Sequence, residues 1–270
     1  MGLVKILIEK DLVDVFKSKS ILLSMLFLPL MFAVFMPLMF VGLPALSDST
    51  ELDPDLVRLV SIFPSLTGNW DSLDTQQKVL IGTSYLPLMF LVMLPAIIPS
   101  IIAAEAVAGE KERNTLESLL ATPLSDSELL LGKILSSAIP AIIISWISCI
   151  PYLLITNISL ADQIGFFVIL DLDYGLRFLI MTVAIMPLVS FGSCSAMEFF
   201  STKAKTARDA QQFSVFIILP LMMIALVQLF LALFSEIFLI LGIVALLVVD
   251  FGLFQVARGS FSRESLISRL

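Results

Sequence analysis

The chain has 270 residues, of which 59% are hydrophobic and 14% are charged, and its formal net charge is −7. A soluble domain has about 45–50% apolar and about 25% charged residues, so this composition excludes a soluble protein and indicates an integral membrane protein. The acidic balance argues against nucleic acid as a partner, because phosphate backbones are bound by basic surfaces. With no histidine, and with Cys149 and Cys194 inside apolar runs as small packing residues, no metal or redox site is expected.

The first element expected is a helix over residues 2–19. Four lysines surround its apolar residues, which can share one side: Leu3, Ile6, Leu7, Val13 and Phe16. This pattern predicts an amphipathic helix that lies in the membrane interface. An ordinary polar lead-in to the first span has the same composition, so both interpretations stay open. A signal peptide is not expected, because the following apolar run is too long and no cleavage site is evident.

Six apolar stretches are long enough to cross a membrane, which requires about 20 residues. They are 21–43, 81–103, 134–155, 176–197, 213–234 and 237–256. The last two are separated only by Ser235 and Glu236, which predicts a tight helical hairpin. Residues 1–270 are therefore expected to form a single transmembrane domain.

The basic residues of the predicted loops indicate the orientation. Thirteen lysines and arginines lie in the N-terminal segment, the 105–133 loop, the 198–212 loop and the C-terminal segment. The opposite side has only Arg58, Lys78 and Arg177. Cytoplasmic loops are enriched in Lys and Arg, so both termini and the 105–133 loop are predicted to lie in the cytoplasm, with the protein in the plasma membrane.

The loops on the opposite side show fewer signals. In the acidic loop 44–80, Asp53 and Pro54 are typical of an N-cap followed by a proline at the first helical position, which predicts a short helix on the membrane surface. The second outer loop contains the apolar stretch 164–170, which is too short to span. It is a re-entrant piece, an interfacial piece or an early start to the fourth helix.

Polar residues within the spans have two interpretations. Ser145 and Ser148 lie on one face of the third span, and Asp250 is the only acidic residue deep in a predicted span. An acid within a span is by default a functional candidate, so these three residues are candidates for a transport path. Helix packing is the alternative for the serines, as it is for the small residues around Gly192, and pairing with Arg258 is the alternative for Asp250.

Residues 105–133 form the longest charged segment and connect the second and third spans. Leu116, Leu119 and Leu120 have the spacing of one helix face. Pro123 would end that helix, since the residue before a proline is disfavoured in the α conformation. Ser125 and Glu128 have the spacing of a capping box that starts the next helix. Two short helices around a proline turn would make a rigid surface for a soluble partner.

The sequence EKERNTLESLLATPLSDSELLLGK in this loop resembles the signature of ABC-2 type transporter permeases. Many members have glycine before the threonine, where this chain has Asn114, so the two differ at that turn. Two further stretches are similar to the family's second cytoplasmic loop and closing segment: Ala207, Arg208, Ala210, Gln211 and Gln212, then Phe261, Arg263, Glu264 and Leu266. The resemblance implies that the following residues couple the chain to an ATPase: Glu110, Glu112, Arg113, Thr115, Leu116, Glu117, Leu119, Leu120 and Pro123.

The resemblance also implies an architecture and partners. It implies an all-α membrane protein of the type V exporter kind, with six transmembrane helices, an N-terminal amphipathic interfacial helix and a cytoplasmic coupling helix. It further implies an ABC ATPase subunit that carries the ATP, a second permease copy or paralogue, and contact with membrane lipid. This chain would bind no cofactor, since its only Gly-Lys pair, Gly132-Lys133, lacks the flanking residues of a phosphate-binding loop.

Three functions are compared at this point. An export permease is favoured, and the short loops are most similar to the sodium and drug exporter branch. A membrane enzyme is disfavoured, because the predicted spans contain no Ser-His or Asp-Asp pair. A non-transporting anchor or sensor that recruits an ATPase remains the alternative.

Overall fold

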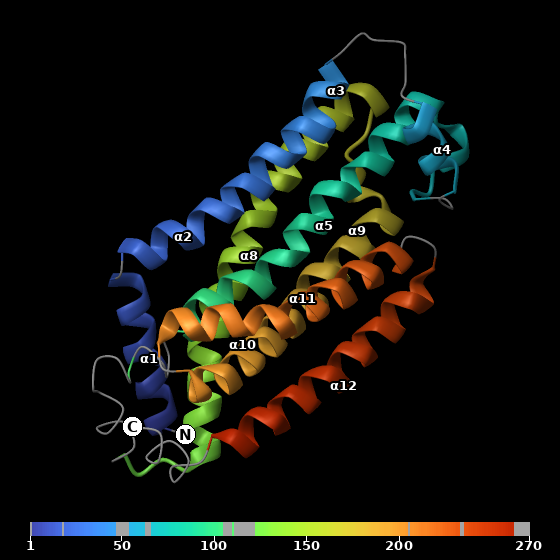
Figure 1. Cartoon of the computed structure of the whole chain (residues 1–270). Helices are drawn as coiled ribbons and strands as arrows, with labels where there is room; N and C mark the ends of the chain where they lie inside the picture. The colour runs from blue at the N-terminus through green and yellow to red at the C-terminus, as the bar shows by residue number, and fades with distance from the viewer. Residues whose placement is uncertain are drawn as a thin grey trace.

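The computed structural model describes residues 2–17, 19–46, 54–62, 66–104, 110, 122–204, 206–232 and 235–261. Every regular element among these residues is a helix, and the long helices run side by side in one bundle (Figure 1). The chain is therefore an all-α protein, as the sequence predicts.

The N-terminal part is helical from its first described residue. Helix α1 (Gly2–Lys17) confirms the expected N-terminal helix, and α2 (Lys19–Leu30) starts the first span. The span continues through two π-helical segments, η1 (Met31–Phe35) and η2 (Leu38–Gly42), into α3 (Leu43–Leu46).

The π-helical segments follow the prolines. Segments η1, η2 and the later η6 (Met181–Ile185) are centred on Ala33, Phe40 and Val183. Each of these residues lies four positions before a proline: Pro37, Pro44 and Pro187. A proline provides no N–H to the carbonyl four residues earlier and its ring clashes with that group, so the helix widens there into a π-bulge.

The remaining helices follow the predicted spans, with longer boundaries. They are α4 (Pro54–Ile62), α5 (Thr75–Ala104), α8 (Asp126–Ile164), α9 (Leu172–Ile180), α10 (Met186–Lys203), α11 (Ala207–Ala232) and α12 (Glu236–Ser260). Short 3-10 turns lie at η3 (Trp70–Ser72) and η5 (Val168–Leu170). The third span is the largest difference, because α8 starts eight residues before and ends nine residues after the predicted 134–155.

Five stretches of the described chain are long and apolar enough to cross a membrane. They are Met25–Leu46, Thr75–Pro99, Asp126–Ile164, Leu172–Lys203 and Ile237–Ser260. Helix α11 coincides with the predicted fifth span, 213–234, but is not among these five. The chain is thus a multi-pass membrane protein, and the count of six spans stays a prediction.

Helices α5 and α10 form the interior of the bundle. Helix α10 packs against α5, α8, α11 and α12, and α5 also packs against α8 and α11. The outer faces of α2 and α12 carry exposed apolar side chains such as Phe27 and Val248, as expected of surfaces that contact lipid or another membrane subunit.

The two ends of the bundle differ in what they carry. Helix α1, the start of α8 and the end of α12 lie at one end, here called the α1 end (Figure 1). Helix α4 and the loop before α9 lie at the opposite end, here called the α4 end (Figure 1). The loops predicted to be cytoplasmic belong to the α1 end, and those predicted to be outer belong to the α4 end.

One cap and one helix start predicted from the sequence are confirmed, whereas the predicted N-cap Asp53 lies outside the described residues. Ser125 and Glu128 form the predicted capping box at the start of α8, and α4 begins at Pro54. In the second outer loop, α8 ends at Gly165, whose φ of +85° favours glycine. Asp171 then caps α9, so the fourth span starts earlier than predicted, and 165–170 form a connection that contains only the short 3-10 turn η5.

Candidate functional site

The site lies where α1 crosses the first turns of α8. Gly132 permits this close crossing, because a Cβ there would lie 2.8 Å from Cδ2 of Leu7. Leu7 is buried at this contact, in a small apolar cluster with Leu130 and Ile134 of α8. The crossing places the polar side chains of α1 beside Lys133.

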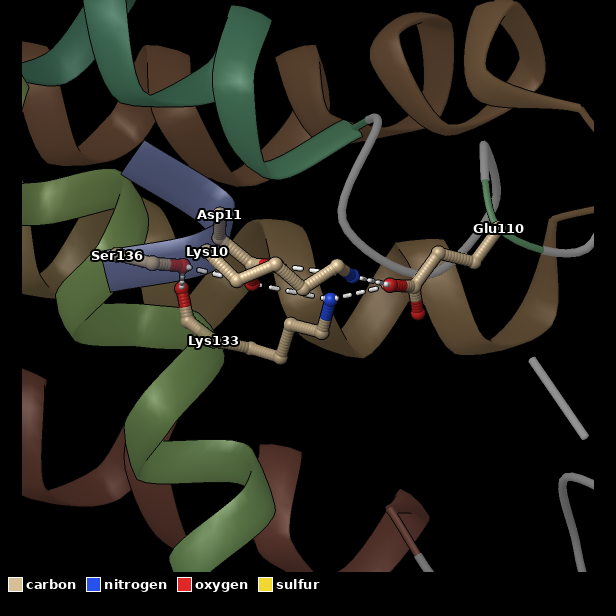
Figure 2. A network of polar contacts seen from close by, with 5 residues as sticks. All are labelled: Lys10, Asp11, Glu110, Lys133 and Ser136. Carbon is tan, nitrogen blue, oxygen red and sulfur yellow. Dashed lines mark hydrogen bonds and ion pairs between the residues drawn. The ribbon is translucent and has the colours of Figure 1, made fainter. Parts of the chain in front are cut away.

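Lys133 is the centre of a buried ionic network. Its Nζ donates to Oε1 of Glu110 at 2.7 Å and lies 3.1 Å from Oδ2 of Asp11 (Figure 2). Lys10 adds a second positive charge, with its Nζ 3.6 Å from Glu110 and 3.4 Å from Asp11. Ser136 donates more weakly to Oδ2 of Asp11, at 3.4 Å. We call these five residues the Lys133 network.

The network joins three separate parts of the chain. Lys133 and Ser136 belong to α8, Lys10 and Asp11 belong to α1, and Glu110 belongs to the segment between α5 and α8. The Lys133 side chain is only 1% exposed, whereas that of Lys10 is 56% exposed. A buried ammonium group destabilises the fold unless acidic groups pair with it. The burial of Lys133 therefore favours the positions that Glu110 and Asp11 occupy beside it.

Glu198 is a second acidic residue within the bundle, and the sequence analysis missed it. The apolar pattern predicts an end of the fourth span at 197, which leaves Asp250 as the only acidic residue deep in a predicted span. Helix α10 instead continues to Lys203 and buries Glu198 completely. Neither of its side-chain oxygens has a hydrogen-bond partner among the described residues, and its nearest charges are those of Lys133, Glu110 and Asp11. The absence of a turn signal between 197 and 203 could have revealed this continuation.

Asp250 lies elsewhere, between α12 and α10. It is 4% exposed, and its carboxylate packs against the Cα of Gly192, where any side chain would collide with it. Neither oxygen of Asp250 has a hydrogen-bond partner in the part of the chain that the structure describes. The alternative interpretation, pairing with Arg258, is therefore not supported among these residues, and Arg258 is exposed.

The two serines of the candidate transport path are not joined to Asp250. Ser145 donates to the carbonyl of Ala141 and Ser148 to that of Ile144, both one turn earlier in α8. Such bonds satisfy a hydroxyl within its own helix. This geometry favours the packing interpretation for Ser145 and Ser148, and Asp250 remains the stronger candidate for a transport path.

Of the predicted coupling residues, the structure describes two. Glu110 is buried against Lys133, and Pro123 is exposed just before α8. The other predicted coupling residues lie outside the described residues: Glu112, Arg113, Thr115, Leu116, Glu117, Leu119 and Leu120. The short helix predicted over this segment stays a prediction.

Comparison with protein families decides the class of this chain. The model of the family described as ABC-2 type transporter matches residues 2–227. The chain belongs to the ABC-2 type transporter family. A comparison with curated proteins gives no match. The sodium and drug exporter branch of the ABC-2 family stays a prediction.

Membership places this chain as the membrane component of an ABC transporter. The matched region includes α1, the whole Lys133 network, Glu198 and most of α11, whereas Asp250 lies beyond it. Gly132 and Lys133 end the sequence motif that resembles the family signature, and the motif alone predicts no structural role for them. The structure assigns them one: Gly132 permits the contact with α1, and Lys133 holds the acids of α1 and the loop.

Proposed function

We propose that this ABC-2 protein is the transmembrane permease subunit of an ATP-driven exporter. A separate ATPase subunit binds and hydrolyses the ATP, and this chain contains no ATPase site. The observation that supports the proposal is the buried contact between Glu110 and Lys133. It connects the loop that would receive the ATPase to a helix long enough to cross the membrane.

The Lys133 network makes three elements move together. If the loop moves without α8, Lys133 leaves Glu110 and remains buried with one fewer acid, which is costly in a medium of low dielectric constant. If it moves without α1, the contacts of Lys10 with Glu110 are lost as well. A displacement of the loop is therefore passed to α1 and to the start of α8, which is the rigid coupling that an ATP-driven permease requires.

The proposal includes a partner permease and an orientation. A second copy or a paralogue would contact the exposed apolar side chains of α2 or α12, and lipid would contact the rest. The excess of lysine and arginine at the α1 end supports an orientation with this end and both termini in the cytoplasm, and the proposed location is the plasma membrane. The predicted helix at 114–122 is the proposed docking contact for the ATPase.

The partner is tested by purifying a tagged copy from gently solubilised native membranes. We expect a soluble ATPase in stoichiometric amount, and its loss when residues 114–123 are altered. A protein that purifies without an ATPase, and without partner-dependent ATP hydrolysis, would contradict the permease assignment. Partner-dependent hydrolysis without movement of any cargo would support the alternative, an anchor or sensor that recruits an ATPase.

Coupling is tested with the double variant Glu117→Ala/Leu120→Ala. We expect the bundle to stay folded while ATP hydrolysis no longer drives transport, because the docking contact has lost its charged and apolar groups. The matched control is Ile6→Ala/Glu9→Ala, which also removes one apolar and one acidic side chain at the α1 end, both of them exposed. If ATP hydrolysis still drives transport in Glu117→Ala/Leu120→Ala, the segment 114–122 is not the docking contact for the ATPase.

A further inference from the structure

The three tyrosines of this chain meet at one place towards the α4 end. Tyr85 of α5, Tyr152 of α8 and Tyr174 of α9 are each no more than 2% exposed. The Tyr152 hydroxyl donates to the carbonyl of Ser84 at 2.9 Å and lies 2.8 Å from the Tyr174 hydroxyl. The rings of Tyr85 and Tyr174 are 5.0 Å apart. Side chains from three helices thus form one rigid aromatic wall.

Arg177 lies beside this wall, and no acidic residue among those the structure describes pairs with it. It follows Tyr174 by three residues and so shares its face of α9. Arg177 is 7% exposed, although the sequence analysis had counted it as a basic residue of the outer side. Its guanidinium interacts with the Tyr85 hydroxyl, at a geometry that falls short of a regular hydrogen bond. We call Ser84, Tyr85, Tyr152, Tyr174 and Arg177 the tyrosine–arginine cluster.

Three donors of the cluster make no regular hydrogen bond to the described residues. Nε and Nη1 of Arg177 and the hydroxyl of Tyr85 are enclosed and have no hydrogen-bond partner among the described residues. By contrast, the hydroxyls of Tyr152 and Tyr174 are bonded to each other. The groups without a regular hydrogen bond to the described residues are therefore those of Arg177 and Tyr85.

The nearby acid, Asp171, is already occupied. Its Oδ1 accepts the backbone N–H groups of Asp173 and Tyr174, and its Oδ2 accepts that of Gly68 at 3.0 Å. In the described part of the chain, no carboxylate lies within 4 Å of the Arg177 guanidinium. Within the described part of the chain, the cluster thus carries one positive charge that no carboxylate neutralises.

A buried guanidinium with no anion is unfavourable, and in a membrane protein such a group is a functional candidate. The planar fork of arginine matches the oxygens of a phosphate, and a tyrosine hydroxyl adds a third donor. Arg177 also lies on the order of 8 Å along the helix from Leu172, near one end of an apolar stretch, which is close to the depth of lipid headgroups. We propose that the tyrosine–arginine cluster binds a phosphate group.

The phosphate belongs either to a lipid headgroup or to a free ion, and binding measurements separate the two. The probes are dihexanoylphosphatidylglycerol, dihexanoylglycerol, which lacks the phosphate, and inorganic phosphate. Each is titrated against the full chain in detergent, without ATP or an ATPase. We expect binding of a phosphate-bearing probe, and about tenfold weaker binding after Arg177→Gln, because charge-assisted hydrogen bonds are lost.

Two further variants keep the result interpretable. Tyr85→Phe removes only an unpartnered hydroxyl, so the protein should fold normally and bind the phosphate several-fold more weakly. Arg58→Gln removes an arginine of α4 whose side chain is 82% exposed, and it should bind like the wild type. This pair still tests the cluster if Arg177→Gln fails to fold.

Each outcome bears on the proposal. Binding of dihexanoylphosphatidylglycerol alone, with the expected loss in Tyr85→Phe, identifies a lipid headgroup site. Equal binding of inorganic phosphate with the same loss identifies a site for a free phosphate. Equal binding of dihexanoylglycerol, equal losses in Arg58→Gln and Tyr85→Phe, or no binding of either phosphate probe would overturn the proposal. Because no ATPase is present, failure here is distinct from failure of the permease assignment.

Discussion

Lys133 and Glu110, which are 23 positions apart, form a 2.7 Å ion pair in which the lysine side chain is 1% exposed. No helix periodicity connects these two residues, because Glu110 precedes α8 in a separate segment. The pair forms only when the loop and α8 are together, and Asp11 and Lys10 of α1 complete the network around it. Its integrity therefore reports on the assembly of the α1 end.

Replacing Lys133 should destabilise the protein strongly. In Lys133→Met, Glu110 and Asp11 would keep only the half-exposed Lys10 as a cation, and the expected loss in the free energy of unfolding is about 3–5 kcal/mol. Lys10→Met is the matched control, and its expected loss is about 0–1 kcal/mol because that ammonium is largely hydrated. Denaturation of both variants in detergent measures the difference. Similar losses in the two would show that the burial of Lys133 is not what stabilises the network.

Gly192 should not tolerate a side chain. In Gly192→Ala the added Cβ would collide with the carboxylate of Asp250 and lie 3.2 Å from Cδ2 of Leu221. We expect a loss of about 1–3 kcal/mol from overpacking. Gly252→Ala in α12 is the control, because nothing lies within 4 Å of its Cβ position. That change should be neutral or stabilising by up to about 1 kcal/mol, since alanine is the better helix former.

A double-mutant cycle checks the cause of the Gly192 effect. In an Asp250→Ala background, the carboxylate that collides with the new Cβ is absent, so Gly192→Ala should destabilise the protein less. Additive effects in thermal unfolding would mean that another neighbour causes the loss.

Neutralising Asp250 should make the protein more stable and less active in transport. Asp250→Asn keeps the shape and removes a buried charge that has no partner among the described residues. We expect the free energy of unfolding to rise by about 1–3 kcal/mol, because an amide is easier to bury than a carboxylate. Transport should fall if the charge lies on the transport path. A fall in stability would reveal a partner for Asp250, and unchanged transport would remove it from the path.

The serines of α8 provide the comparison for Asp250. Their hydroxyls bind carbonyls of their own helix, so Ser145→Ala and Ser148→Ala should change transport less than about twofold, given how weakly such bonds act. A large loss of transport in either variant would restore that serine to the path.

Two buried tyrosines should respond differently to loss of their hydroxyls. Tyr152→Phe breaks the bonds to the Ser84 carbonyl and to the Tyr174 hydroxyl, which keeps only a 3.4 Å contact with Oγ of Ser84, so we expect a loss of about 1–3 kcal/mol. Tyr85→Phe removes a hydroxyl that has no partner among the described residues and should be neutral in the absence of a ligand. Unfolding in detergent compares the two. Equal losses would indicate that Tyr85 has a partner that the described residues do not include.

Local sequence patterns predicted much of the fold correctly. The capping box at Ser125, the start of α4 at Pro54 and the N-terminal helix each depend on residues within a few positions of one another. Such short-range preferences act on the backbone before any distant contact forms. The ends of spans were predicted less well, as Glu198 shows, because tertiary packing can extend a helix past its apolar stretch.

Composition, short periodicities and a continuous motif were enough to predict the class of protein, the main apolar spans and the family. Which charges are buried, and which of them are paired, depends on contacts between distant parts of the fold. Lys133 and Arg177 are both basic residues that looked like parts of solvated surfaces. One is neutralised by acids from α1 and the loop, and the other lies beside tyrosines, with no acid among the described residues as its partner. The difference arises from helices that meet across long sequence separations, and no local pattern records which side chains those helices bring together.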